Sequence, residues 1–87
     1  MLEPQEKEAQ RLLRAFAVLV RNTTWKCGRV ERLAVGYLRA QLTDFGRVRL
    51  LVREMLLHFK LNGKRKNEFL DAIKRLEKRR IIKIETL

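Results

Sequence analysis

The last third of the chain constrains the fold most, because its residue pattern changes twice within a short stretch. Asn62 and Gly63 both tolerate the left-handed backbone conformation that ends helices and makes tight turns. Residues 67–80 then place apolar side chains on one side of a helical wheel and cations on the other. Residues 81–85 are rich in isoleucine, which suits a strand. The pattern predicts a turn, a two-faced helix capped by Asn67, and a short strand.

Two more helices are predicted in the first half of the chain. One runs from Pro4 to about Arg21, because its apolar residues keep a three-and-four spacing and proline suits a first helical turn. Another covers about residues 30–42 by the same spacing. The connector between them contains Trp25, which either fills the core over the helix ends or offers a platform on which a base stacks. We favour the core position.

The stretch that starts at Thr43 allows two interpretations. Thr43 and Asp44 are suitable caps for a long helix, whereas residues 46–50 alternate polar and apolar side chains as a strand does. A third helix therefore begins near Asp44 or, if the strand forms, near Leu51. This helix is apolar around much of its girth, so we expect it to be buried on two sides or to form a dimer contact.

The charge of the chain indicates a polyanionic partner. Its 21 lysines and arginines outnumber 10 aspartates and glutamates, which gives a formal charge of +11. The excess is concentrated in residues 46–87, which hold 13 basic and 5 acidic side chains, against 8 and 5 in residues 1–45. We therefore expect the binding surface to lie mostly in the second half.

Other features narrow the class of protein. Cys27 is the only cysteine and His58 the only histidine, so neither a disulfide nor a zinc site is expected, and a reducing cytoplasmic location is predicted. No apolar run approaches membrane-spanning length, and the acidic start is unlike a secretory signal. The chain contains no serine, no glycine-rich phosphate loop and no clustered carboxylates. We expect no enzyme, no cofactor and no small-molecule substrate.

Residues from about 46 to 84 resemble the winged helix-turn-helix superfamily of DNA-binding proteins. The resemblance rests on a strand or loop at residues 46–48, a short helix at 52–59, the turn at Asn62-Gly63, a recognition helix at 67–80 and a strand. It implies a mainly α fold with an extra N-terminal helix and a short C-terminal strand. Two features depart from the family: the chain stops at Leu87, before a wing and a third strand, and the turn is unusually basic.

The resemblance also implies that the recognition helix enters the major groove of DNA. Asn67 and Arg75 are then the candidates for base contacts, because their forked polar groups match the edges of adenine and guanine. Phosphate contacts need only a flexible positive charge. The candidates for these are Lys64, Arg65, Lys66, Lys74 and Lys78. An ordinary solvated helix with intrahelical charge pairs is the alternative for this segment.

Together these observations predict one nucleic-acid-binding domain over residues 1–87, with residues 1–45 as a helical scaffold or dimerisation part and 46–87 as the helix-turn-helix part. We expect a sequence-specific protein that binds double-stranded DNA as a homodimer, acting as a small transcriptional regulator or as a replication or partition accessory factor. One alternative is an architectural or ribonucleoprotein component that binds DNA or RNA through charge. Another is a winged-helix module that binds an acidic protein.

Overall fold

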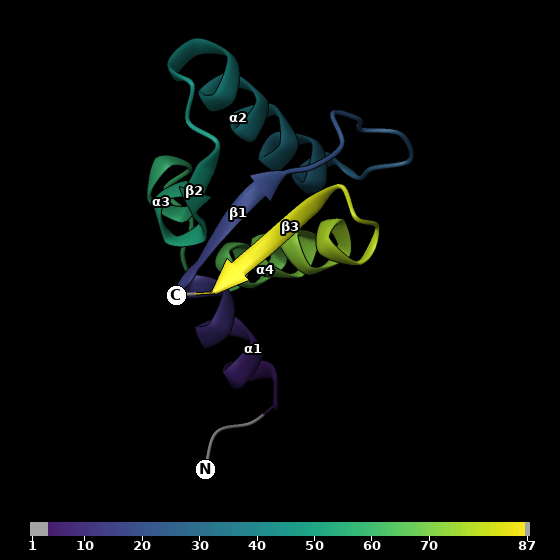
Figure 1. Cartoon of the computed structure of the whole chain (residues 1–87). Helices are drawn as coiled ribbons and strands as arrows, with labels where there is room; N and C mark the ends of the chain where they lie inside the picture. The colour runs from purple at the N-terminus through teal and green to yellow at the C-terminus, as the bar shows by residue number, and fades with distance from the viewer. Residues whose placement is uncertain (1–3, 87) are drawn as a thin grey trace.

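The structure is a computed structural model that describes the backbone of residues 4–86 and the side chains of residues 7–86. Helices form most of it, which confirms the predicted mainly α class, and a small sheet of three antiparallel strands completes it. Figure 1 shows the elements. Their order over these residues is α1 (Pro4–Leu13), β1 (Ala15–Leu19), α2 (Arg29–Phe45), β2 (Arg49–Leu51), α3 (Val52–His58), α4 (Gly63–Lys78) and β3 (Ile82–Thr86).

The sheet has the order β2-β1-β3, so the first strand of the chain lies in the middle. Phe16 is paired with Leu51 of β2 on one side and with Glu85 of β3 on the other. Alternate residues of β1 point to opposite faces. Ala15 and Ala17 are fully buried on the inner face, while Phe16 lies on the outer face beneath the guanidinium of Arg49, 4.9 Å from its ring centre.

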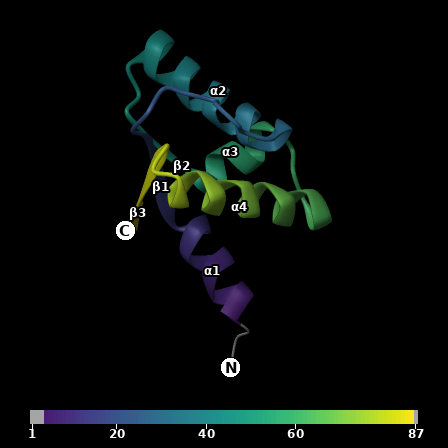
Figure 2. The same cartoon turned by 90° about the vertical axis from the view of Figure 1, so that its right-hand side faces the viewer.

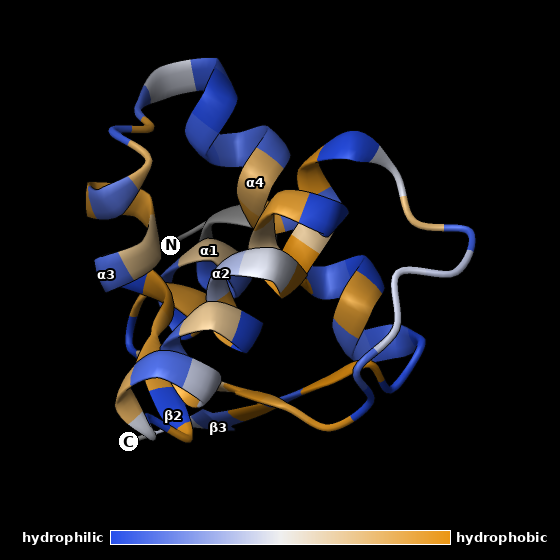
Figure 3. Ribbon diagram, turned by 90° about the horizontal axis from the view of Figure 1, so that it is seen from above, coloured by the Kyte–Doolittle hydropathy of each residue, from blue (hydrophilic) through white to orange (hydrophobic). Residues whose placement is uncertain are grey.

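The helices bury the inner face of the sheet around one core. Figure 3 shows the strands at one side of the molecule, with α1, α3 and α4 on the other. Figure 2 shows α4 running between α2 and α1. Each large apolar side chain removed from water contributes about 1.5–3 kcal/mol. The core includes Leu12, Val35, Leu38, Leu50, Val52, Met55, Phe69, Ile73, Leu76, Ile81 and Ile82.

The predicted first helix is wrong beyond Leu13. The chain turns at Arg14, and residues 15–19 form β1 instead of continuing a helix to Arg21. A run of five apolar residues fits the spacing of either element, so the choice is made by the partners available. Here β2 and β3 supply backbone hydrogen-bonding partners on both edges, which a helix over the same residues would leave unpaired.

The second half follows the predicted order of elements with shifted boundaries. Of the two interpretations from Thr43, the strand is confirmed: β2 ends at Leu51 and α3 begins at Val52, while Thr43 and Asp44 extend α2. The C-terminal strand is also confirmed. Leu57 is 73% exposed, so α3 is not buried on a second side within the chain, and the alternative expected of it, a dimer contact, stays a prediction.

Helices α3 and α4 are each followed, two residues after the last helical residue, by a residue in the left-handed conformation. Lys60 has φ 56° and Arg80 has φ 60°. The next N–H then reaches back to a carbonyl of the last helical turn, from Leu61 to Leu56 at 2.9 Å and from Ile81 to Leu76 at 3.0 Å. These bonds satisfy carbonyls that the helix end leaves free. The stop after α3 therefore precedes the predicted Asn62-Gly63.

An ion pair joins the segment before β2 to α3 and makes part of the stability depend on pH. The guanidinium of Arg47 lies 2.6 Å from one carboxylate oxygen of Glu54 and donates to the other at 2.8 Å. This hydrogen bond lowers the pKa of Glu54 below its ordinary value of 4.5, against the smaller opposing effect of burial. A lowered pKa means that the pair stabilises the fold fully above that ordinary value and is lost as the pH falls through the lowered pKa.

We therefore predict that Glu54→Gln unfolds at a lower urea concentration than the unmodified chain at pH 7, and that the two midpoints converge as the pH falls below the lowered pKa of Glu54. Urea titrations followed by circular dichroism at several pH values measure this. The matched control is Glu68→Gln, because Glu68 is an exposed carboxylate on α4. A gap between the Glu54→Gln midpoint and that of the unmodified chain that persists at low pH would contradict the assignment.

Candidate nucleic-acid interface

One side of α4 is packed into the core and the opposite side faces solvent. Its apolar residues Phe69, Ile73 and Leu76 are buried as predicted, and Leu70 and Ala72 join them. At about 100° per residue, the residues that face solvent lie on the opposite side of the helical wheel. This face, called the outer face of α4 below, consists of Lys64, Asn67, Asp71, Lys74, Arg75 and Lys78.

All seven residues predicted to contact DNA lie on α4, but the structure does not bring them all to one face. The outer face holds five of them, and of these Lys74 is half-buried. Arg65 is exposed on the flank toward α2, where it lines a hollow with Arg29 and Leu33. Lys66 is half-buried on the flank toward α1 and lines a different hollow. The predicted set is therefore divided among three directions.

The helix begins earlier than predicted. Asn62 is the residue before the first turn, and Gly63, with φ 57°, opens the helix. The predicted cap at Asn67 is therefore wrong: Asn67 is an exposed residue inside the helix. Residues 64–66 form the first helical turn instead of a basic turn before it. Three cations thus lie at the positive end of the helix dipole, where they are unfavourable unless an anion is near.

Arg75 is tied to α2. Its Nε donates to Oε1 of Glu31 at 3.0 Å, and Arg79 lies 3.9 Å from the other carboxylate oxygen. Glu31 is only 7% exposed, so this carboxylate is largely removed from water and depends on the two arginines for its partners. Arg75 itself remains 55% exposed. Its guanidinium is thus oriented by a buried acid while one side is open to solvent.

One acid of α4 forms an intrahelical charge pair, as an ordinary solvated helix does, and another pairs with α1. Asp71 lies 3.6 Å from Lys74, three residues further along the helix. Glu77 accepts from Arg11 of α1 at 3.1 Å. Burial alone would lower the pKa of Arg11, but its hydrogen bonds to Glu77 and Glu8 outweigh this and raise it. Asp71 is thus paired on the outer face itself and Glu77 on the flank toward α1, while Lys64 and Lys78 form no ion pair within the described residues.

The loop between β1 and α2 lies against the C-terminal end of α4. Arg79 donates to the main-chain oxygens of Trp25 and Lys26, the second at 3.2 Å, and approaches Sγ of Cys27 at 3.3 Å. The predicted core position of Trp25 is wrong: its indole is 72% exposed. The loop also makes local hydrogen bonds, from the amide of Thr23 to the oxygen of Arg21 at 2.9 Å and from the amide of Cys27 to the oxygen of Thr24 at 3.0 Å.

Sequence reasoning missed the residues that organise this end of α4. Neither Arg79 nor Glu31 was singled out from the sequence. One signal was present for Glu31: it is the only acid in the first turn of α2, beside apolar positions that predict burial. No signal in the sequence pairs Arg79 with the carbonyls of a loop more than fifty residues away.

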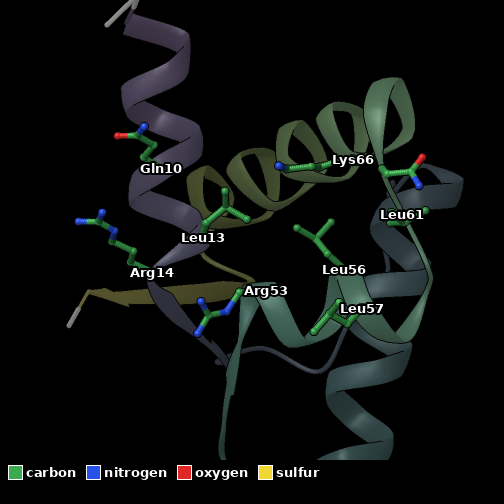
Figure 4. A pocket seen from close by; sticks show the side chains of 9 residues that line it. Gln10, Leu13, Arg14, Arg53, Leu56, Leu57, Leu61 and Lys66 are labelled. Carbon is green, nitrogen blue, oxygen red and sulfur yellow. The ribbon is translucent and has the colours of Figure 1, made fainter.

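A second hollow lies on the other flank of α4. It is a groove between α1, α3 and the start of α4, with a volume of about 480 Å³. Figure 4 shows that leucines from α1 and α3 line it and that Arg53 and Lys66 lie at its rim. The groove, called the leucine groove below, is formed by Gln10, Leu13, Arg14, Arg53, Leu56, Leu57, Leu61, Asn62 and Lys66.

Scans against protein-family models, curated protein sequences and solved structures found no match to this chain. Over the described residues, no helix is both long and apolar enough to span a membrane. The same residues contain no group of three histidine, cysteine, aspartate or glutamate side chains placed to hold a metal ion. The candidate interface therefore stands on its own geometry and charge.

We call the hydrogen bonds from Arg79 to the loop between β1 and α2 the clasp, and we predict that this one side chain holds the loop against α4. Replacing Arg79 by Ala removes the donors to two loop carbonyls, so we expect faster trypsin cleavage after Lys26 and a loss of about 1–3 kcal/mol in the free energy of unfolding. Mass spectrometry of timed digests locates the cut. Arg80→Ala is the control, since Arg80 is an exposed neighbour of the same charge. Equal cleavage of both variants would rule out the clasp.

Proposed function

We propose that the chain is a DNA-binding protein that docks the outer face of α4 on a duplex. The observation that carries this proposal is the solvent-exposed pair Lys64 and Lys78 at the two ends of that face, on a chain of charge +11. With its side chains an α-helix is about 10–12 Å in diameter, so it fits into the major groove of DNA, which is about 12 Å wide. Cations at both ends of such a helix are placed to reach phosphates on either side.

The arrangement of strands supports the winged-helix form of this proposal. In that pattern the strand after the recognition helix has an antiparallel partner, reached through the wing. Here β3 follows α4, and its antiparallel partner is β1, with Ala15 opposite Thr86. The strand position that the sequence left without a candidate is thus filled from the N-terminal half. At the end of the sheet where a wing would connect the two strands, α1 leads into β1.

The residues of α4 take different roles in this proposal. Asn67 remains the candidate for a base contact, because it is exposed in the first half of the outer face and its forked amide matches the edge of adenine. Arg75 reads a base only from the orientation that Glu31 imposes, since its Nε is already engaged. Lys64, Lys74 and Lys78 suit phosphates, whose charge a flexible ammonium can follow. A regulatory role and a homodimer remain predictions of the sequence.

We predict that Lys64→Ala combined with Lys78→Ala weakens binding to every duplex alike. Losing two phosphate contacts lowers the slope of log K against log salt by about 2, and affinity falls by roughly tenfold or more at moderate salt. Fluorescence anisotropy with labelled duplexes over a salt series measures both quantities. Lys83→Ala with Lys60→Ala is the charge-matched control, because Lys83 lies on the outer face of the sheet and Lys60 in the turn after α3.

Two results separate the parts of this proposal. If the control pair lowers the salt slope as much as the α4 pair, binding is spread over the whole charged surface and the α4 face has no special role. If Asn67→Ala leaves the preference among duplexes of different sequence unchanged, the protein binds DNA without reading bases through that residue. That second result favours an architectural role over a regulator.

The leucine groove favours a second candidate function, contact with an acidic protein segment. Leu57 is 73% exposed at this groove, and the side chains around it include Arg14, Arg53 and Lys66 but no acid. An amphipathic helix inserts apolar residues into such a groove and places its charges on the rim. The rim here is positive, so a helix with leucines on one face and glutamates beside them is the complementary partner.

A synthetic leucine- and glutamate-rich helical peptide tests this second function. We predict that it binds the protein and that Leu57→Ala weakens the complex by about 1–2 kcal/mol, because an exposed apolar anchor is lost without disturbing the core. Isothermal titration calorimetry measures the affinity. Arg53→Glu should abolish binding, whereas Arg32→Glu on α2, outside the groove, is the control. Equal losses for the two charge reversals would reduce the effect to net charge.

A further inference from the structure

We infer that Trp25 and the basic hollow beside it form a subsite for an unpaired nucleotide next to the duplex held by α4. This inference rests on the proposed function and names a substrate feature, a single-stranded extension at the edge of the bound duplex. It assigns a role to a loop outside α4. The loop covers residues 20–28, and in Figure 1 it projects past the C-terminal end of α4.

The indole of Trp25 is presented to solvent on a held loop. It is 72% exposed, whereas large aromatic side chains usually bury most of their surface. The amide of Trp25 donates to the hydroxyl of Thr23 at 3.1 Å, and the amide of Cys27 donates to the oxygen of Thr24 at 3.0 Å. Arg79 fixes the carbonyl side of the same loop. The backbone that carries the exposed ring is therefore held in place, although the ring is not part of the core.

The loop is also anchored at its start. The amides of Val20 and Arg21 both donate to the oxygen of Ile81, at 2.9 and 3.0 Å. Ile81 connects α4 to β3, so the loop is joined to the C-terminal end of α4 from two sides. A platform held in this way loses little conformational freedom when a ligand binds, which favours binding.

A basic hollow lies between this loop and the outer face of α4. It has a volume of about 420 Å³ and is lined by Lys26, Glu31, Arg75, Lys78 and Arg79. The one acid in the lining, Glu31, already has an arginine at each carboxylate oxygen. Lys78 forms no ion pair in the described part of the chain, and the ammonium of Lys26 lies 5.9 Å from the centre of the Trp25 ring. The lining keeps a net positive charge and suits a phosphate group.

An aromatic face beside a phosphate site selects a particular form of nucleic acid. Within a duplex, both faces of each base are covered by neighbouring bases, so an indole stacks only on a base that has left the stack or was never paired. Lysines at the hollow take the phosphate of the same nucleotide. Lys78 borders both the hollow and the outer face of α4. The phosphate backbone of a nucleic-acid strand bound along α4 therefore leads into the hollow. A strand that extends beyond the duplex supplies the unpaired base.

The test compares a blunt labelled duplex with the same duplex carrying a single-stranded adenosine extension of about four nucleotides. Anisotropy of the label gives the affinity of the full chain for each. Emission from Trp25 reports contact at the ring directly, because this is the only tryptophan in the chain. We expect the extension to raise affinity by at least about fivefold and to quench the emission, whereas the blunt duplex binds with little quenching.

Trp25→Ala should remove the preference for the extension while leaving affinity for the blunt duplex unchanged. Trp25→Phe should retain part of the preference, because phenylalanine also stacks; it serves as the folded control if the alanine variant proves unstable. If both duplexes bind equally to the unmodified chain without quenching, or if Trp25→Ala keeps the preference, the subsite is overturned and the α4 proposal stands. If neither duplex binds even at low salt, the proposed function fails and the subsite fails with it.

Discussion

The fold depends on a single central strand. β2 and β3 are each paired with β1, so the two outer strands belong to one sheet only because β1 lies between them. Small side chains at Ala15 and Ala17 on its inner face let the helical layer approach closely, and both are fully buried. The contacts that β1 makes are distant in sequence, from residues 49–51 on one side and 82–86 on the other. Such contacts form late in the search for the native state, because long loops must close first.

The sequence predicted best those elements whose structure is decided by neighbouring residues in the chain. The two-faced pattern of α4 places Phe69, Ile73 and Leu76 inward by helix geometry alone, and these residues are buried. The strand at residues 82–86 was likewise predicted by its isoleucines. In contrast, residues 15–19 are all apolar, so they fit the period of a helix and that of a strand. The strands β2 and β3, which decide between the two, lie far along the chain. Local pattern therefore predicted the end of the chain better than its beginning.

The candidate interface shows the same division between local and distant determinants. The outward orientation of Lys78 follows from the helical wheel, so the sequence predicted it, and Lys64 shares this face because the helix begins earlier than predicted. The roles of Arg75 and Arg79 depend on Glu31 and on the carbonyls of residues 25 and 26, which no spacing rule connects to α4. Because these two arginines hold the structure together, the freely presented charges on α4 are mainly lysines. Exposed lysines suit contact with the phosphate backbone of DNA more than base reading, for which Asn67 is the candidate.

The pairing of Ala15 with Thr86 has a mechanical consequence. The start of β1 lies directly opposite the end of β3 in the antiparallel pair. A force pulling these two positions apart acts along the hydrogen bonds of an antiparallel pair, which lie perpendicular to the strands, and so loads one bond pair at a time. The two strands therefore separate one residue pair at a time, at much lower force than if they had to slide past each other.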